Sequence, residues 1–460
     1  MTFLWSLSKQ ARPAFLQHSI FVYSLLLTVG FLLTLRLFML VDKYAVNILF
    51  WDQWDFYNAF FQNRSLWEVF SWQHGPHRQG VGFVFTKFLA ELSGWNSRTE
   101  AFAITGIICL STILALYLRL RLFGPLFWGD VAIPLTFLTP AQYEIFIITP
   151  NLSHGAFPLL LLVLYCFGWT IQKRFLRYCV VLALNFLLIY TGFGIFIGVI
   201  TPIIFIVDLF LACRNGIFWD MILSAFFTLL SFVSFGLFFI DYSIAPAADC
   251  FQFPHPQYWE YPQFMALTFA NFMGLRGVGL KQLIMGGIVL LIMIFISIHH
   301  TKKFLKETYQ SRKMNIVIVI LLVFSLLFSA NTALGRVCLG MSAAQASRYV
   351  TYLIPAFFGL FLHILTIQDV KIKNFFLAIT IIILFVASFP LKKVDWETMK
   401  SFSHGKKQWK EHYLRTEDIE ESNLTSGFKI YPWPEHTKLK EKLDYLKMKK
   451  LNLYRDHVAD

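Results

Sequence analysis

Ionisable side chains are concentrated in one stretch of an otherwise apolar chain, residues 51–78. Asp52 and Asp55 lie three residues apart, so a helical turn would place both on one face, whereas an extended loop would point them apart. A carboxylate can act as a general base toward a hydroxyl group, or it can bind a divalent cation such as Mg²⁺ or Mn²⁺. The alternative role is structural: the two acids cap a loop helix and pair with Arg64 or Arg78.

Histidines and aromatic rings surround these acids. His74 and His77 could serve as metal ligands, acid–base groups or phosphate partners. Neither has a carboxylate or cysteine beside it at ligand spacing, so phosphate binding or structural hydrogen bonding is favoured and no metal site is predicted. The rings that could stack on a sugar, or alternatively form the aromatic belt at a bilayer surface, are Trp51, Trp54, Tyr57 and Trp72.

A second polar region, residues 331–349, contains Arg336 and the motif Ser347-Arg348-Tyr349 directly before an apolar run. The planar guanidinium of arginine can bind a phosphate through two parallel hydrogen bonds. The alternative is an ordinary arginine that anchors a helix at the membrane surface. Glu144 and His154 lie in or beside apolar runs, where polar residues are costly and often functional.

The composition predicts an integral membrane protein. Of the 460 residues, 57% are hydrophobic and only 15% are charged, and several apolar runs approach the ~20 residues that cross a bilayer as a helix. The runs are continuous rather than alternating, which predicts helices and excludes a β-barrel. The net charge of +13 does not indicate a nucleic-acid partner, because the basic residues lie mostly between apolar runs and in the C-terminal tail.

We predict an all-α fold with about 11 transmembrane helices. The predicted spans are 20–40, 101–118, 131–149, 155–171, 176–191, 195–212, 217–240, 282–299, 315–330, 350–367 and 374–390. Residues 264–281 contain Arg276 and Lys281 and are predicted to lie at the interface. Basic residues in alternate short gaps, from Arg119 to Lys373, predict that those gaps are cytoplasmic and the N-terminus is inside.

This orientation places every long polar segment on the extracytoplasmic face. Residues 1–390 form the transmembrane domain, with a long first loop at 41–99 that holds the candidate site. Within that loop, a helix from about Pro76 to Leu92 is predicted to lie along the membrane surface with His77 at its start. Residues 391–460 form a small extracytoplasmic tail that caps the outer loops.

The architecture resembles that of the GT-C glycosyltransferases, polytopic enzymes with an Asp in a long first extracytoplasmic loop. Trp72-Gln73-His74-Gly75-Pro76-His77-Arg78 is similar to a Trp-x-Gln-His-x-x-His-Arg pattern in bacterial proteins of that class. Ser347-Arg348-Tyr349 is similar to their late-loop arginine. The family pattern carries an acid between the two histidines, where this chain has Gly75-Pro76.

The resemblance implies an inverting hexosyltransferase of a bacterial inner (plasma) membrane, active on the periplasmic face. It would move a sugar from a polyprenyl-phosphate donor to a glycan or lipid-linked acceptor, as in the biosynthesis of O-antigen, lipopolysaccharide or another surface polysaccharide. Asp55 or Asp52 would be the base, and Asp55 is favoured because Trp54 and Phe56 flank it. The donor phosphate would be held by Arg348 with Arg336, Arg78, His77 and His74.

Two other classes of protein remain open. An O-antigen-type polymerase or ligase would also have outer loops rich in arginine, although its largest functional loop would come late in the chain. A lipid-linked-sugar flippase or transporter would need helical repeats and polar groups near mid-membrane. Glu144 and Asp208 keep that second class open.

Overall fold

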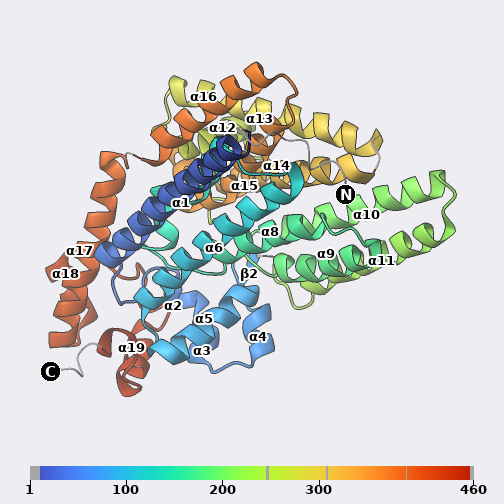
Figure 1. Ribbon diagram of the computed structural model, residues 1–460. Coiled ribbons are helices and arrows are strands. Elements are labelled where there is room, and N and C mark those ends of the chain that lie inside the picture. Colours follow the sequence, from blue (N-terminus) through green and yellow to red (C-terminus); the bar gives the residue numbers. More distant parts are fainter. Residues whose placement is uncertain (1–10, 245–247, 307–308, 390, 456–460) are drawn as a thin grey trace.

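The computed structural model describes residues 11–244, 248–306, 309–389 and 391–455. Nearly all regular structure in these ranges is helical, and their one β-ladder pairs two strands of two residues each. Long helices form a bundle, and the first loop and the tail lie together at one end of it (Figure 1).

Eight helices in the described part of the chain are long and apolar enough to cross a membrane, which agrees with the predicted all-α integral membrane class. They are α1 (Ala11–Tyr44), α6 (Ser97–Phe123), α10 (Ile195–Arg214), α11 (Phe218–Phe238), α13 (Leu280–Lys306), α14 (Tyr309–Arg336), α15 (Val350–Leu365) and α16 (Val370–Ser388). Many large apolar side chains on these helices are not covered by the rest of the protein, including Leu27, Phe210 and Phe295.

The other three predicted spans are shorter or broken. The predicted span 131–149 consists of η1 (Trp128–Val131), α7 (Ala132–Phe137) and η2 (Pro140–Ile145). Its break has a local cause, because Pro140 cannot donate to a helix and Thr139 before it is extended and caps Ala141 N at 3.3 Å. The predicted spans 155–171 and 176–191 correspond to α8 (Ala156–Gly168) and α9 (Arg174–Ile189).

The first loop folds into several short elements, and the predicted helix over 76–92 corresponds to the last of them. They are α2 (Gln53–Phe56), α3 (Asn58–Phe61), α4 (Leu66–Ser71), β1 (Gln73–His74), β2 (His77–Arg78) and α5 (Gly80–Ser93). The predicted helix start at Pro76 is wrong, because Gly75 has a φ of +56° and turns the chain so that His74 pairs with His77. The helix therefore begins only at Gly80.

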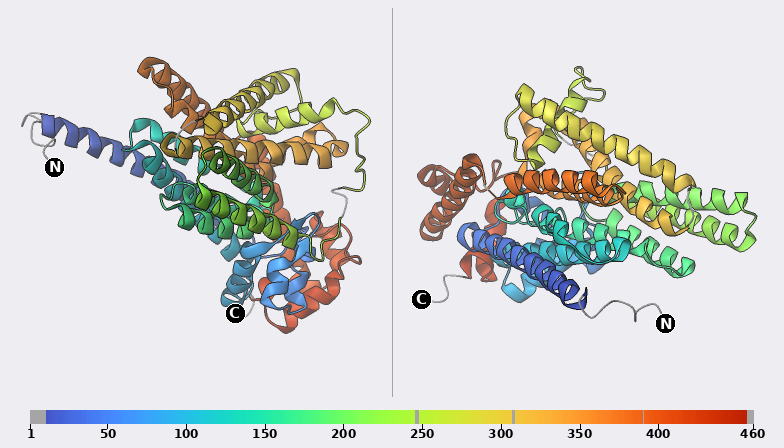
Figure 2. Two further views of the ribbon diagram at one scale, coloured as in Figure 1. Left: turned by 90° about the vertical axis from the view of Figure 1, so that its right-hand side faces the viewer. Right: turned by 45° about the horizontal axis from the view of Figure 1, so that its top comes forward.

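The tail folds into α17 (Lys393–Thr416), α18 (Ile419–Ser426), α19 (Leu439–Met448) and η6 (Asn452–Tyr454). It packs on the first loop: Trp51 N donates to Ile430 O at 2.8 Å, and Asn452 N donates to Gly94 O at 2.9 Å. The two views of Figure 2 show these distant segments side by side at one end of the bundle.

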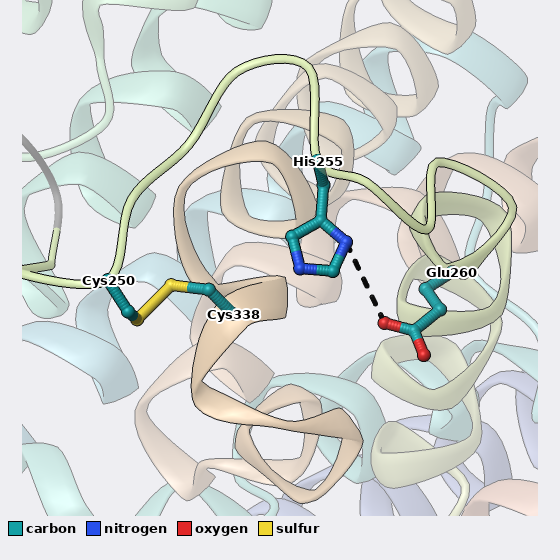
Figure 3. The surroundings of a disulfide bond; sticks show 4 residues. All are labelled: Cys250, His255, Glu260 and Cys338. Carbon is teal, nitrogen blue, oxygen red and sulfur yellow. Dashed lines mark ion pairs between the residues drawn. A yellow bond between two sulfur atoms is a disulfide. The ribbon is translucent and has the colours of Figure 1, made fainter.

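The remaining elements are α12 (Glu260–Phe272), η3 (Val337–Leu339), η4 (Met341–Gln345) and η5 (Ser347–Tyr349). With 13 residues, α12 is about 20 Å long, which is shorter than a bilayer core. A disulfide joins Cys250, in the loop before α12, to Cys338 in η3, and His255 Nδ1 lies 3.9 Å from Glu260 Oε2 beside it (Figure 3). This bond ties the loop to the segment that leads to Arg348.

Candidate active site

Asp52 and Asp55 lie on one helical turn, because Asp52 precedes α2 and Asp55 N donates to Asp52 O at 3.0 Å. The side chain of Gln53 stabilises the turn. It is buried, donates to Pro150 O at 2.8 Å and accepts from Phe50 N at 2.8 Å. The tail also stabilises the turn, because Ile430 O accepts a hydrogen bond from Trp51 N. The two carboxylates therefore have fixed but different surroundings.

The carboxylate of Asp55 is occupied by the tail. It accepts hydrogen bonds from the hydroxyls of Tyr431 and Thr437, the latter at 2.5 Å, and Lys442 Nζ lies 3.9 Å away. Lys442 also donates to Trp54 O. Burial lowers the pKa of Lys442 to about 8, an effect that the charge of Asp55 partly opposes. Asp55 thus binds the tail to the first loop.

The carboxylate of Asp52 is exposed, and no described residue donates a hydrogen bond to it. Its negative charge nevertheless acts on nearby groups. Burial lowers the pKa of His74, and the charges of Asp52 and Asp55 oppose that shift. The charge of Asp52 also acts favourably on the guanidinium of Arg348. Asp52 therefore lies within electrostatic range of both His74 and Arg348.

Three imidazoles, those of His74, His77 and His154, lie near one another. The ring of His77 lies 5.0 Å from that of His154 and 4.2 Å from that of Phe193. Burial, followed by the charges of His74 and Arg336, lowers the pKa of His77 to about 3. Burial and the neighbouring histidines lower the pKa of His154 in the same direction. These two rings are neutral at ordinary pH and can only act there as neutral hydrogen-bonding groups.

A glycine allows these segments to meet. Gly192 lies in the turn between α9 and α10, with a φ of +52°, and its N–H donates to Arg78 O at 3.3 Å. A Cβ at this position would lie 2.8 Å from both Ser153 O and the Tyr352 hydroxyl. Only glycine fits both the conformation and the space, so the hairpin, the 151–155 turn and α15 can approach closely.

Arg348 is held by Glu144 but is not covered by it. Arg348 Nη1 lies 2.6 Å from Glu144 Oε1, and Arg348 N donates to Glu144 Oε2 at 3.2 Å. The hydroxyl of Ser347 donates to Ala141 O at 2.6 Å and fixes the same two segments together. The side chain of Arg348 is 47% exposed and that of Glu144 only 17%, so part of the guanidinium remains open to a ligand.

The other two candidate arginines differ from each other. Arg78 is buried and donates to three carbonyls, those of Phe238 at 2.9 Å, Ser71 and Ile240, so its geometry favours a structural role over phosphate binding. The side chain of Arg336 makes no hydrogen bond or ion pair with any residue in the described ranges, and its charge acts on His77. Arg336 is therefore the second arginine that a phosphate could engage.

The four aromatic candidates divide into two pairs. Trp54 and Tyr57 are fully buried, and the hydroxyl of Tyr57 donates to the buried carboxylate of Glu100. Trp51 is 43% exposed and Trp72 is partly exposed. The structure therefore leaves only the second pair accessible for stacking on a sugar.

The structure adds partners that the sequence analysis did not identify. Tyr431, Thr437 and Lys442 contact Asp55 from the tail, and Glu100 contacts Tyr57 from α6. Their signal in the sequence is weak, although Tyr431-Pro432-Trp433-Pro434 is an unusual aromatic motif in a charged tail. Among the described residues, no three His, Cys, Asp or Glu side chains are arranged to hold a metal ion.

No protein-family model, curated protein or solved structure matches this chain. The functional argument therefore rests on the geometry of the candidate site. Its central feature is that Asp52 and Arg348, which have opposite charges and partly free faces, lie near one another at one end of a helical bundle.

Proposed function

We propose that the protein is a membrane glycosyltransferase that moves a sugar from a polyprenyl-phosphate donor to a hydroxyl of a glycan or lipid-linked acceptor. The observation that carries this proposal is that the exposed Asp52 carboxylate lies within electrostatic range of the half-exposed Arg348 guanidinium. A group-transfer reaction of this kind needs a base for the acceptor and a cation for the leaving phosphate.

The reaction assigns one role to each charge. Asp52 takes the proton from the acceptor hydroxyl, whose oxygen attacks the anomeric carbon from the side opposite the phosphate. The bond between that carbon and the phosphate oxygen breaks, and its electron pair leaves with the lipid phosphate, so the configuration inverts. Arg348 and Arg336 neutralise the charge that develops on the phosphate. His77 and His154 offer neutral hydrogen-bonding partners.

The environment of each aspartate supports Asp52 rather than Asp55 as the base. The sequence favoured Asp55, but its carboxylate is engaged by Tyr431, Thr437 and Lys442. A base needs a free lone pair within reach of the substrate hydroxyl. Asp52 satisfies that requirement, and Asp55 orients the turn.

We further propose that this end of the bundle is extracytoplasmic and that the shorter helices α8 and α9 also lie within the membrane, with about 11 membrane-embedded segments in all. Disulfides persist in oxidising compartments, and Cys250–Cys338 supports a periplasmic assignment for this end. The polyprenyl chain would then reach the site laterally from the bilayer of a bacterial inner membrane.

The flippase alternative has less support. It rests on Glu144 and Asp208 as transport groups near mid-membrane, and both carboxylates already have partners. Glu144 pairs with Arg348, while Asp208 pairs with Arg312 at 2.5 Å and accepts from Tyr178 at 2.6 Å.

The test of the proposed function compares Asp52→Asn with Asp55→Asn in purified, lipid-reconstituted protein, using a polyprenyl-phosphate hexose as donor. Asp52→Asn should bind the donor normally and reduce turnover by about 10²–10⁴-fold. Asp42→Asn is the matched control, because Asp42 is an exposed acid that pairs with Arg98 at 2.8 Å on the surface. Wild-type turnover in Asp52→Asn would rule out the assigned base, and donor flipping without transfer in the wild type would favour the flippase.

A further inference from the structure

A second feature of the same end of the bundle is an open pocket of about 590 Å³ between the end of α1 and the start of α17. Figure 1 shows α17 beside that end of α1. The pocket is lined by Lys43, Tyr44, Leu391, Lys393, Trp396, Glu397 and Lys400. Three ammonium groups and one carboxylate thus surround it, together with two aromatic rings.

The positive charge of the pocket is only partly neutralised. Lys393 Nζ lies 3.6 Å from Glu397 Oε1, which uses the one carboxylate of the lining. Lys43 and Lys400 are exposed and form no ion pair with any residue that the structure describes. Lys43 Nζ lies 5.5 Å from the centre of the Tyr44 ring. An anion in the pocket would therefore meet two lysines that are not engaged in an ion pair with a described residue.

The pocket lies at the depth where two candidate spans end. The apolar part of α1 ends at Tyr44, and α16 ends at Ser388, three residues before the pocket lining begins. Arg36 Nη1 donates to Ser388 O at 2.7 Å and joins the two helices beneath the pocket. The rings of Tyr44 and Trp396 pack edge to face with centres 5.9 Å apart, as is typical of a membrane–water interface.

These lysines are not explained by membrane topology. The basic turns that determine orientation lie at the other ends of the helices, between α6 and η1, between α8 and α9 and between α13 and α14. The pocket lysines lie at the opposite end, with the first loop and the tail. The extracytoplasmic face of a membrane protein normally carries fewer lysines, so we interpret this positive cluster as a binding site for an anion.

We propose that this pocket binds the phosphate headgroup of a membrane lipid, with Lys43 and Lys400 on the phosphate and Trp396 against the adjoining carbon atoms. The phosphate belongs to an anionic phospholipid or to a polyprenyl phosphate, and the pocket chemistry is the same for both. This inference is independent of the proposed transferase activity, because it concerns lysines that do not contact Asp52 or Arg348.

The test uses the full-length protein in phosphatidylcholine vesicles that contain a small fraction of brominated phosphatidylglycerol, which quenches nearby tryptophan fluorescence. The signal of Trp396 is the difference between wild type and Trp396→Phe. Brominated phosphatidylglycerol should quench this signal more strongly than brominated phosphatidylcholine. The double variant Lys43→Gln/Lys400→Gln should weaken the preference by roughly tenfold or more, because each lysine near a surface contributes independently to the attraction of an anionic lipid.

Two controls and one competition complete the design. Lys407→Gln/Lys449→Gln removes the same charge from exposed positions outside the pocket and should leave the preference unchanged. Lys43→Arg/Lys400→Arg should retain it. If polyprenyl phosphate displaces brominated phosphatidylglycerol when present at a lower mole fraction than that lipid, the ligand is a polyprenyl phosphate. If it does not displace the brominated lipid, the ligand is the anionic phospholipid. Equal quenching by both brominated lipids, or an unchanged preference in Lys43→Gln/Lys400→Gln, would overturn the proposal.

Discussion

Two arginine–carboxylate pairs, one at each end of the bundle, differ in how far the rest of the protein covers them. At the end with the basic turns, Arg119 Nε lies 2.6 Å from Asp130 Oδ1, and both side chains are at most 5% exposed. At the end with the first loop, Arg348 pairs with Glu144 at a similar distance, but its side chain is 47% exposed. A buried pair with no open face can only hold helices together, whereas a half-covered arginine can also bind a ligand.

The largest effect on stability is expected from Arg119→Ala, which leaves the fully buried Asp130 without its cation. Removal of one partner of a buried pair typically costs about 3–5 kcal/mol. The free energy of unfolding in detergent should fall by about that amount, and Arg348→Ala should lower it much less. Equal losses in the two variants would remove the proposed distinction between the two ends.

Arg348→Ala should have its main effect on the donor. Loss of charge-assisted hydrogen bonds to a phosphate predicts roughly 10–100-fold weaker donor binding, measured as KM or directly by titration. Arg348→Lys keeps the charge but loses the planar fork, so its loss should be smaller but clear. The loss of donor affinity in Glu144→Gln should lie between the losses in Arg348→Ala and Arg348→Lys. This variant removes the carboxylate that holds the guanidinium but keeps the guanidinium itself. If all three variants bind the donor as the wild type does, another residue holds the phosphate.

His77 predicts a pH dependence of stability at the first-loop end of the bundle. Its pKa is about 3 in the folded protein, against an ordinary value of 6.5, because it is buried. Below about pH 6.5 the unfolded chain binds a proton that the folded chain does not. The contribution of neutral His77 to the free energy of unfolding is therefore complete above that pH. It is lost as the pH falls toward 3, by up to ~1.4 kcal/mol per pH unit.

The matched variant is His77→Gln, which cannot titrate in this range. Its free energy of unfolding should change less steeply than that of the wild type between pH 6.5 and 4. Parallel curves for the two proteins would mean that His77 is protonated in the folded state.

The smallest effect is expected from Tyr431→Phe, which removes one hydroxyl from Asp55. The loss should be about 1 kcal/mol, and it should appear as faster proteolysis of the tail rather than as loss of donor binding. Trp433→Phe is a suitable control, because Trp433 is 61% exposed and lies two residues after Tyr431 in the same segment. If Tyr431→Phe abolishes turnover while the tail stays protected, Asp55 does more than hold the tail.

The sequence by itself determined the class of the protein and the polar candidates. Apolar runs such as 195–212 and 282–299 predict α10 and α13 because transfer of a helix into lipid depends on the local side chains alone. The predicted span 131–149 is not one continuous helix, because total hydrophobicity does not register the break at Pro140. The spacing of Asp52 and Asp55 left open whether they share a helical turn, and it could not distinguish between their roles.

Only the tertiary structure decided which charged groups are free. Asp55 differs from Asp52 because Tyr431, 376 residues later, donates to it. Arg78 differs from Arg348 because carbonyls at the end of α11 cover its guanidinium, whereas Glu144 covers Arg348 on one side only. Such contacts join segments far apart in the chain, so no local pattern encodes them, and the burial that separates a structural charge from a ligand-binding one exists only in the folded protein.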